Sequence, residues 1–132
     1  QQSVNLPHAV CYRLQVRMNV KFRKATVEDW EMILPLLEGT GLVRSLEVTR
    51  VLFEKFVNHS QHCIIVAEKN QNLVGYAWAQ SYGLHLRTSD ITTRLNDLFV
   101  LSEYRNQGIA KGLLESVISW AKENNVKYLQ WQ

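Results

Sequence analysis

The sequence has few cysteines and no long apolar run. Two cysteines, Cys11 and Cys63, lie far apart in the 132 residues and lack the paired spacing of a metal site or a disulfide framework. We therefore expect reduced thiols and no metal. No apolar run approaches the ~20 residues that a membrane-spanning helix needs, and no segment resembles a signal peptide. These absences predict a cytoplasmic protein with no membrane partner.

Basic residues are not massed in any single run. The net charge of +3 would suit nucleic acid, but lysines and arginines are scattered and no groove-reading helix or stacking motif is evident. An anionic cofactor accounts for the charge equally well, so we expect no nucleic-acid partner. His59 and His62 lack further ligands nearby, which favours a solvated helix end over a zinc site. The hydrophobic fraction of 46% predicts one domain with an apolar core.

The stretch from Leu95 to Ala121 predicts a strand, a short loop and a helix. Alternation after Leu95 indicates a strand that has Asp97, Phe99 and Leu101 on the same side as Leu95. The helix follows from apolar residues recurring three or four apart: Ile109, Leu113, Val117, Trp120 and Ala121.

The loop before this helix is small, basic and rich in backbone donors. The N–H groups at a helix start lack partners, and the helix dipole adds partial positive charge there, so the site favours an anion such as phosphate. Gly108 and Ala110 leave room for a phosphate to approach the backbone, while Arg105 and Lys111 add positive charge. The spacing is neither that of a Walker loop nor that of a dinucleotide fingerprint.

The pattern Arg105-x-x-Gly108-x-Ala110 resembles the Arg/Gln-x-x-Gly-x-Gly/Ala signature of the GNAT N-acetyltransferase superfamily, whose loop cradles the diphosphate of acetyl-coenzyme A (acetyl-CoA). The preceding strand is similar to that of the diamine and polyamine acetyltransferases. The resemblance implies acetyl-CoA as acyl donor, bound by Arg105, Asn106, Gln107, Gly108, Ile109, Ala110 and Lys111. It also implies that the thioester is held in extended form by backbone groups of Leu98, Phe99 and Val100.

The first half of the chain predicts a strand and two helices. Residues 18–26 indicate a strand that runs into a helix over residues 27–38, with Thr26 and Asp29 as its capping box. Ser45 is expected to cap a second helix. The predicted buried side of that helix consists of Val48, Val51, Leu52 and Phe56.

The second half predicts a hairpin, the strand-loop-helix stretch and a last strand. The hairpin joins residues 63–68 to residues 73–82, and the last strand covers residues 126–132. The order β-α-α-β-β-β-α-β resembles the front of the GNAT fold, which implies an α/β domain with a mixed, mostly antiparallel sheet and helices on both faces. The family's further helix and two strands have no counterpart in residues 19–132, so we expect a C-terminally truncated domain.

Residues 1–17 predict an N-terminal extension to a GNAT-like domain of residues 18–132. A truncated domain would leave its last strand as an open sheet edge. The segment 9–16 alternates like a strand and resembles the closing strand of such acetyltransferases. We hypothesise that it lies antiparallel to residues 126–131, in the same chain or in a partner; the alternative is a read-through extension that is merely ordered. A homodimer with strand exchange is a second way to cover the edge.

The catalytic residues are less clearly marked than the cofactor loop. In the family a Glu on the key strand often acts as base, and the matching position is Asn96, which cannot accept a proton at neutral pH. The neighbouring Asp97 is predicted to act as base or to hold a cationic acceptor; the alternative is a strand-end residue bonded to nearby backbone. Trp78 and Tyr82 are candidates for binding the acceptor, because aromatic faces suit an amine. His85 is a third candidate, because the loop before the key strand places it within reach of the acceptor. Core packing for Trp78 and simple solvation for His85 are the alternatives.

The resemblance therefore predicts an acetyl-CoA-dependent N-acetyltransferase acting on a small primary amine. A catalytically silent acyl-CoA-binding domain is the alternative, since the cofactor loop is intact while the base position is Asn96 and the family's acid-bearing helix has no counterpart.

Overall fold

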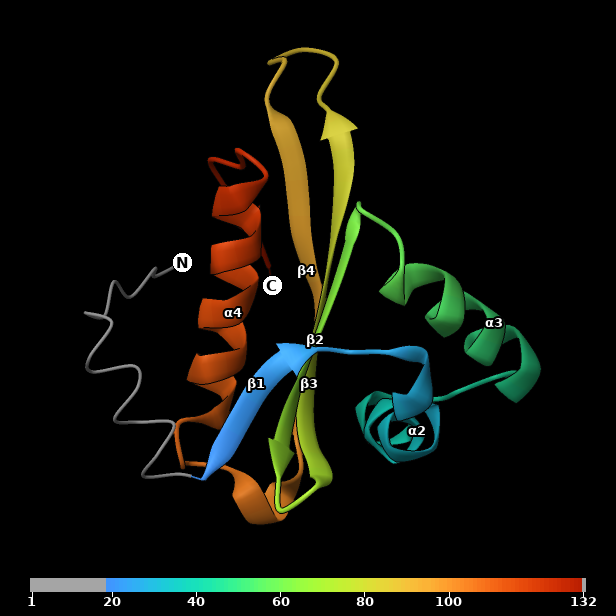
Figure 1. The fold of residues 1–132 in the computed structure, drawn as a ribbon. Coiled ribbons are helices and arrows are strands. Elements are labelled where there is room, and N and C mark those ends of the chain that lie inside the picture. Colours follow the sequence, from blue (N-terminus) through green and yellow to red (C-terminus); the bar gives the residue numbers. More distant parts are fainter. Residues whose placement is uncertain (1–18, 132) are drawn as a thin grey trace.

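The computed structural model describes residues 19–131, in which five strands form one sheet in the order β1-β2-β3-β4-β5 (Figure 1). Neighbouring strands from β1 to β4 are antiparallel, and β5 lies parallel to β4. The strands are β1 (Val20–Lys24), β2 (His62–Lys69), β3 (Asn72–Leu84), β4 (Ile91–Val100) and β5 (Leu129–Gln130). The predicted mixed, mostly antiparallel sheet is confirmed.

Helices cover both faces of the sheet. On one face lie α2 (Trp30–Thr40) and α3 (Leu46–Val57), and on the other lies α4 (Ile109–Glu123) (Figure 1). Two short 3-10 turns, η1 (Val27–Asp29) and η2 (Ser102–Tyr104), precede α2 and the loop before α4. The order of elements and the two-sided layering confirm the predicted fold class. None of the helices within residues 19–131 is long and apolar enough to cross a membrane.

The apolar core has two parts, one on each face of the sheet. Beneath α4 the helical stripe predicted from the sequence is buried: Ile109, Leu113, Val117, Trp120 and Ala121. On the other face a cluster forms around the buried ring of Tyr76 on β3, and its helical members are Trp30, Ile33, Leu36 and Phe53. Burying side chains of this size stabilises the fold by roughly 1.5–3 kcal/mol each. Strand β4 therefore packs against a hydrophobic cluster on each face.

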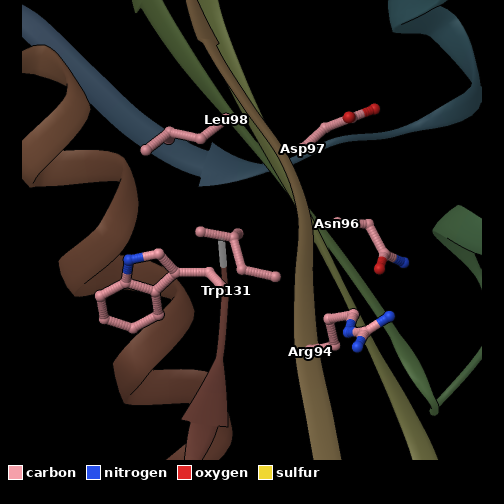
Figure 2. A pocket seen from close by; sticks show the side chains of 6 residues that line it. Arg94, Asn96, Asp97, Leu98 and Trp131 are labelled. Atoms are coloured by element: carbon pink, nitrogen blue, oxygen red, sulfur yellow. The ribbon is translucent and has the colours of Figure 1, made fainter. Parts of the chain in front are cut away.

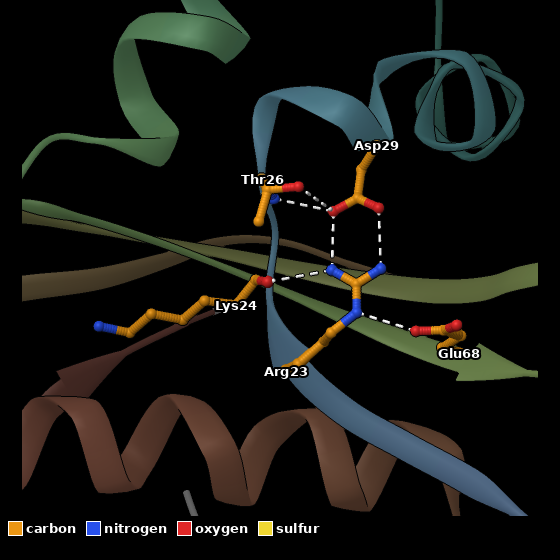
Figure 3. Close-up of polar contacts among 5 residues, drawn as sticks. All are labelled: Arg23, Lys24, Thr26, Asp29 and Glu68. Atoms are coloured by element: carbon orange, nitrogen blue, oxygen red, sulfur yellow. Dashed lines mark hydrogen bonds and ion pairs between the residues drawn. The ribbon is translucent and has the colours of Figure 1, made fainter. Parts of the chain in front are cut away.

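One ion cluster joins β1 to the start of α2. Arg23 donates two hydrogen bonds of 2.8 Å to the carboxylate of Asp29 and one of 2.9 Å to Glu68 (Figure 3). Asp29 also accepts from the backbone N–H of Thr26 at 2.8 Å, which is the capping contact expected from the sequence. Because its ionised form is stabilised chiefly by Arg23, the pKa of Asp29 is lowered from its ordinary value. The cluster fixes the angle at which the chain enters α2.

The buried side of α3 differs from the prediction. Val48, Val51 and Leu52 are 57%, 63% and 41% exposed, whereas Phe53 is buried. This helix projects away from the sheet (Figure 1), so only a narrow stripe of it can be covered. Phe53 occupies that stripe, with its ring centroid 5.8 Å from that of Trp30. Helical spacing identified an apolar face but not its true centre, and the expectation for Val48, Val51 and Leu52 is wrong.

A bulge at Asn96 breaks the alternation of β4. Leu95 and Asp97 pair with consecutive residues of β3, which leaves Asn96 without an opposite residue. Leu95 packs in the core beneath α4, while Asp97 bonds to Tyr76 on the opposite face. The prediction that Leu95 and Asp97 share a side is wrong, because one inserted residue reverses the facing of all residues beyond it.

Strand β5 is shorter than the predicted strand over residues 126–132. Leu129 and Gln130 alone pair with β4, opposite Thr93 and Arg94. Residue 126 is still engaged at the end of α4, where its N–H donates to the carbonyl of Ala121 at 3.0 Å. The proposed partner strand over residues 9–16 lies outside the described residues, as does the whole extension 1–17. That pairing therefore stays a prediction.

Candidate active site

The loop between β4 and α4 presents a row of free backbone donors. Asn106 and Gly108 have φ values of 62° and 83°, in the left-handed region, so the chain turns sharply before α4 begins. Within residues 19–131 no carbonyl accepts from the backbone N–H groups of residues 106–108. The first N–H groups of α4 likewise lack helical partners. The consecutive backbone N–H groups thus lie at the positive end of the helix dipole. Together they favour binding of an anion at this position.

Two basic side chains flank these amides. Arg105 donates from Nε to the carbonyl of Val100 at 2.9 Å, and its guanidinium carbon lies 5.5 Å from the ring centroid of Phe99. These contacts hold the Arg105 side chain at the end of β4, while its terminal nitrogens can donate elsewhere. Lys111 is exposed in the first turn of α4. Free amides and two cations are the donor set that a diphosphate requires, so the loop fits acetyl-CoA.

A cavity of about 410 Å³ lies where β4 and β5 separate. Strand β4 is bonded to β3 along its other edge, but toward β5 it is paired only at Thr93 and Arg94. Beyond these residues the cavity is lined by Leu95, Asn96, Asp97, Leu98 and Trp131. In Figure 2, Leu98 and Trp131 lie toward α4, and Asn96 and Asp97 point to the opposite side of β4. The predicted thioester-holding residues therefore border an open strand edge rather than a closed ladder.

Asp97 belongs to a chain of hydrogen-bonded hydroxyl groups. The hydroxyl of Tyr76 lies 3.0 Å from Asp97 Oδ2 and 2.9 Å from Thr40 Oγ1, and Thr40 Oγ1 lies 3.0 Å from the carbonyl of Leu36. Burial raises the pKa of Asp97, and the hydrogen bond from Tyr76 opposes that rise. Burial also raises the pKa of the Tyr76 phenol, which stays protonated. The alternative reading of Asp97 as a residue bonded to nearby backbone is therefore not what the structure shows.

A second cavity, of about 150 Å³, opens on the other side of Asp97. It lies between α2, α3 and the sheet, and its walls are mainly apolar: Ile33, Leu37, Leu52, Phe53, Phe56, Ile64 and Trp78. Asp97 lines this cavity as well as the one between β4 and β5. One carboxylate therefore borders both spaces.

The predicted acceptor residues are not all brought together. Trp78 lines the apolar cavity, and its indole N–H donates to His62 Nδ1 at 3.1 Å. Tyr82 is 52% exposed, and its hydroxyl contacts the Asn96 side chain at 3.4 Å. His85 lies in the loop at the tip of the β3–β4 hairpin, where its Nδ1 accepts from backbone N–H groups at 3.1 and 3.3 Å. His85 lines neither cavity, and its contact with an acceptor stays a prediction.

Thr40, Tyr76 and Phe56 were not identified from the sequence as site residues. The strand pattern places Tyr76 and Trp78 on one face of β3, so Tyr76 could have been found by its spacing from Trp78. Thr40 gives no such signal, because its contact with Tyr76 joins residues far apart in the chain. Within residues 19–131 no three His, Cys, Asp or Glu side chains are grouped to hold a metal.

Solved structures of acetyltransferases share this fold. Glucosamine-6-phosphate N-acetyltransferase from Arabidopsis thaliana superposes with a TM-score of 0.73 at 20% identity, covering 86% of this chain and 82% of that one. Aminoglycoside 6'-N-acetyltransferase AAC(6')-Ih from Acinetobacter baumannii gives 0.75 at 19% identity, covering 83% and 76%. AAC(6')-Iy, in complex with the bisubstrate analog CoA-S-monomethyl-acetylneamine, gives 0.75 at 18%, covering 84% and 77%. At these identities the likeness is one of fold alone.

Sequence comparison assigns the family. No curated protein gives a significant match to this chain. The sequence profile described as Acetyltransferase (GNAT) family matches residues 26–132, which include both helices beside the apolar cavity, the bulged strand and the loop between β4 and α4. The chain therefore belongs to the GNAT acetyltransferase family, whose acyl donor is acetyl-CoA.

Proposed function

We propose that this protein transfers an acetyl group from acetyl-CoA to a small primary amine. The observation that supports the proposal most is the position of Asp97 on both cavities. One cavity continues the open edge of β4 that leads to the amides of residues 106–108. The other lies between α2, α3 and the sheet. A donor and an acceptor bound one on each side would meet at this carboxylate.

The residues of the donor side would bind and orient acetyl-CoA, which supplies the activated acyl group as a thioester. The amides that follow Arg105 would receive the diphosphate, with Arg105 and Lys111 neutralising its charge. Backbone groups of Leu98, Phe99 and Val100 on the free edge of β4 would align the extended thioester arm. This alignment needs no particular side chain, since main-chain N–H and C=O groups make the contacts.

Asp97 would bind the ammonium group of the acceptor and take up one of its protons, which frees the amine to attack the thioester carbonyl. As the C–S bond breaks, the departing thiolate would take the second proton of the nitrogen. The hydroxyl chain accounts for the fate of the proton that Asp97 takes up. Three hydrogen-bond contacts link Leu36, Thr40, Tyr76 and Asp97, but with Asp97 ionised only two hydroxyl protons serve them. When Asp97 gains a proton, it can donate to Tyr76, Tyr76 to Thr40 and Thr40 to the Leu36 carbonyl. Every contact then still has a proton, so Asp97 keeps its hydrogen-bond partner after proton transfer.

Activity is tested by release of the free thiol of CoA from acetyl-CoA in the presence of primary amines. Titration calorimetry with CoA tests the donor site separately. Gly108→Val should abolish CoA binding, because the side chain would crowd the amides and strain a left-handed residue. Gly83→Val is the matched control: Gly83 has a φ of 81° and open space around it, at the far end of the hairpin. If Gly83→Val weakens CoA binding as much as Gly108→Val, the donor site is not the loop.

A catalytically silent acyl-CoA-binding domain is the second candidate. It is favoured by the side chain of Asn96, because the family often has a Glu at this position and an amide side chain cannot act as a base. The thiol-release assay separates the two functions: an enzyme consumes acetyl-CoA faster with an amine than without, whereas a silent domain binds CoA and never exceeds the blank.

Three further expectations stay proposals. The strand before the loop is similar to that of diamine and polyamine acetyltransferases, so putrescine and spermidine belong in the set of amines. A homodimer would cover the edge strand β5, which light scattering of the full chain tests. A cytoplasmic location is expected from the cysteine content and is tested by fractionation.

A further inference from the structure

The apolar cavity beside Asp97 has one charged group and little else that is polar. Among the described residues that line it, Asp97 is the single charged side chain, and hydroxyl groups come from Thr49 and Tyr76. The Tyr76 hydroxyl is already engaged by Thr40 and Asp97. The N–H of Trp78 is engaged by His62 outside the lining. A ligand in this cavity therefore meets one anionic end and otherwise apolar surface.

The size of the cavity matches one six-membered ring. Its volume is about 150 Å³. An engineered apolar cavity of about 150 Å³ in another protein takes up one benzene molecule. A disaccharide or an aminoglycoside is several times larger and could place only a fragment here. A linear polyamine would fit in width, but its second cation would lie against apolar side chains without a counter-charge, which is costly.

One wall of the cavity is a stack of flat rings. Phe56 and Trp78 lie with centroids 5.8 Å apart and planes 18° from parallel, and the His62 ring stacks on Phe56 at 3.7 Å. His62 Nδ1 accepts the indole N–H of Trp78, which requires a neutral imidazole with its proton on Nε2. Burial, followed by the charges of His59 and Lys55, lowers the pKa of His62, in agreement with that state. The three stacked rings are thus uncharged, and the hydrogen bond from Trp78 to His62 fixes the orientation of two of them. Such a surface favours contact with an aromatic ring.

We infer that the acceptor is a monoamine whose amino group is joined by a short link to a single aromatic ring, an arylalkylamine of the size of benzylamine or phenethylamine. The inference rests on the proposed function and adds the class of acceptor. The ring packs between α2, α3 and the Phe56–Trp78 wall, and the ammonium group pairs with Asp97. Amino sugars and polyamines are disfavoured, because each buried hydroxyl or second cation would lack a partner.

The class is tested with benzylamine, putrescine, spermidine and glucosamine as alternative acceptors at fixed acetyl-CoA. We expect kcat/KM for benzylamine to exceed that for each of the others by about tenfold or more, the discrimination that apolar pockets commonly provide. A preference for glucosamine or a polyamine overturns the inference and leaves the proposed acetyltransferase intact. If no amine is acetylated, the proposed function fails. The acceptor assignment then fails with it, and calorimetry without acetyl-CoA tests the pocket alone: tighter binding of benzylamine than of the other amines supports a ring-binding pocket, and equal or weaker binding overturns it.

Two variants separate the ring pocket from the rest of α3. Leu52→Ser removes part of the cavity wall. Val51→Ser makes a similar change at the preceding residue of the helix, which is 63% exposed and does not line the cavity. Leu52→Ser should raise KM for benzylamine about tenfold, and Val51→Ser should leave it unchanged. Equal effects of the two variants would overturn the placement of the ring. Thermal melts of both variants show whether each remains folded.

Asp97→Asn tests the charged end of the same pocket. It should weaken benzylamine binding about 10- to 100-fold, the range expected for losing one hydrogen-bonded charge pair. Binding of benzyl alcohol, which has the same ring and no charge, should change little. If benzyl alcohol binding falls as much as benzylamine binding, Asp97 shapes the pocket rather than recognising the amine, and the proposed contact is wrong.

Discussion

Replacing Tyr76 with Phe would isolate one hydrogen bond of the site, because the buried ring stays and only the hydroxyl is removed. In the native chain this hydroxyl stabilises the ionised form of Asp97, against the burial that raises its pKa. Tyr76→Phe should therefore raise the pKa of Asp97 further. In its proposed role, Asp97 has to be ionised to bind the ammonium and accept its proton. The acid limb of the kcat/KM profile should accordingly move to higher pH.

The size of this change follows from the strength of the bond. A hydrogen bond to a charged group contributes about 1.5–3 kcal/mol. Asp97 is half-buried, so water replaces part of the lost contact and the lower end applies. About 1.5 kcal/mol corresponds to roughly one pH unit. As the pH is lowered, the variant should thus lose activity at a pH about one unit higher than the native protein does.

The assay is thiol release at amine concentrations from well below to above KM, from pH 4 upward, run on the native protein, Tyr76→Phe and Tyr82→Phe. Tyr82 is the matched control, because its hydroxyl contacts Asn96 and not Asp97. The reasoning is refuted if the acid limb of Tyr76→Phe stays in place or moves to lower pH. It is also refuted if Tyr82→Phe moves the limb by as much.

Two predictions concern stability, both measured by urea denaturation. Asp29→Asn should lower the free energy of unfolding by about 2–3 kcal/mol at pH 7. This is less than the loss for breaking a fully buried ion pair, because Arg23 still pairs with Glu68 and is partly exposed to solvent. The folded-state pKa of Asp29 is depressed, so this contribution is present above its unfolded pKa and is lost as the pH falls through the folded one; the gap between native and variant should close in acid. The exposed-pair control Glu54→Gln should cost under about 0.5 kcal/mol, and an equal cost for both variants would contradict the assignment. Gly75→Ala should cost about 1–3 kcal/mol, because the new Cβ would lie 2.9 Å from the backbone oxygen of Phe99. Gly41→Ala has nothing within 4 Å of its Cβ and should be neutral, so an equal loss of unfolding free energy in the two variants would disprove the close approach.

The order of the elements could be read from the sequence because each has a strong period of its own. A short apolar run rich in β-branched residues marks β2, alternation marks β3, and the stripe from Ile109 to Ala121 marks α4 with its correct buried face. The predicted anion-binding loop between β4 and α4 could be recognised because its residues are consecutive. Its glycine is required by a left-handed turn, and backbone requirements of this kind are visible in local sequence.

The features that define the proposed acceptor site are tertiary and could not be read locally. The bulge at Asn96 follows from how β4 pairs with β3, and it decides that Asp97 faces α2 and α3. The contact from Thr40 through Tyr76 to Asp97 joins three separate elements. The true buried face of α3 depends on how far that helix leans from the sheet, which its own sequence does not encode. The apolar residues of α3 were thus assigned to the core when several of them are exposed.

Strands β4 and β5 separate after two paired residues, and this lowers the cost of ligand entry. Because the two strands share only a two-residue ladder, an extended ligand can lie along β4 without first breaking main-chain bonds of the sheet. The groove is preorganised, so little binding energy is spent on deforming the protein. Amide hydrogens on that edge of β4 should exchange with deuterium readily in the free protein and become protected only when a cofactor lies against them.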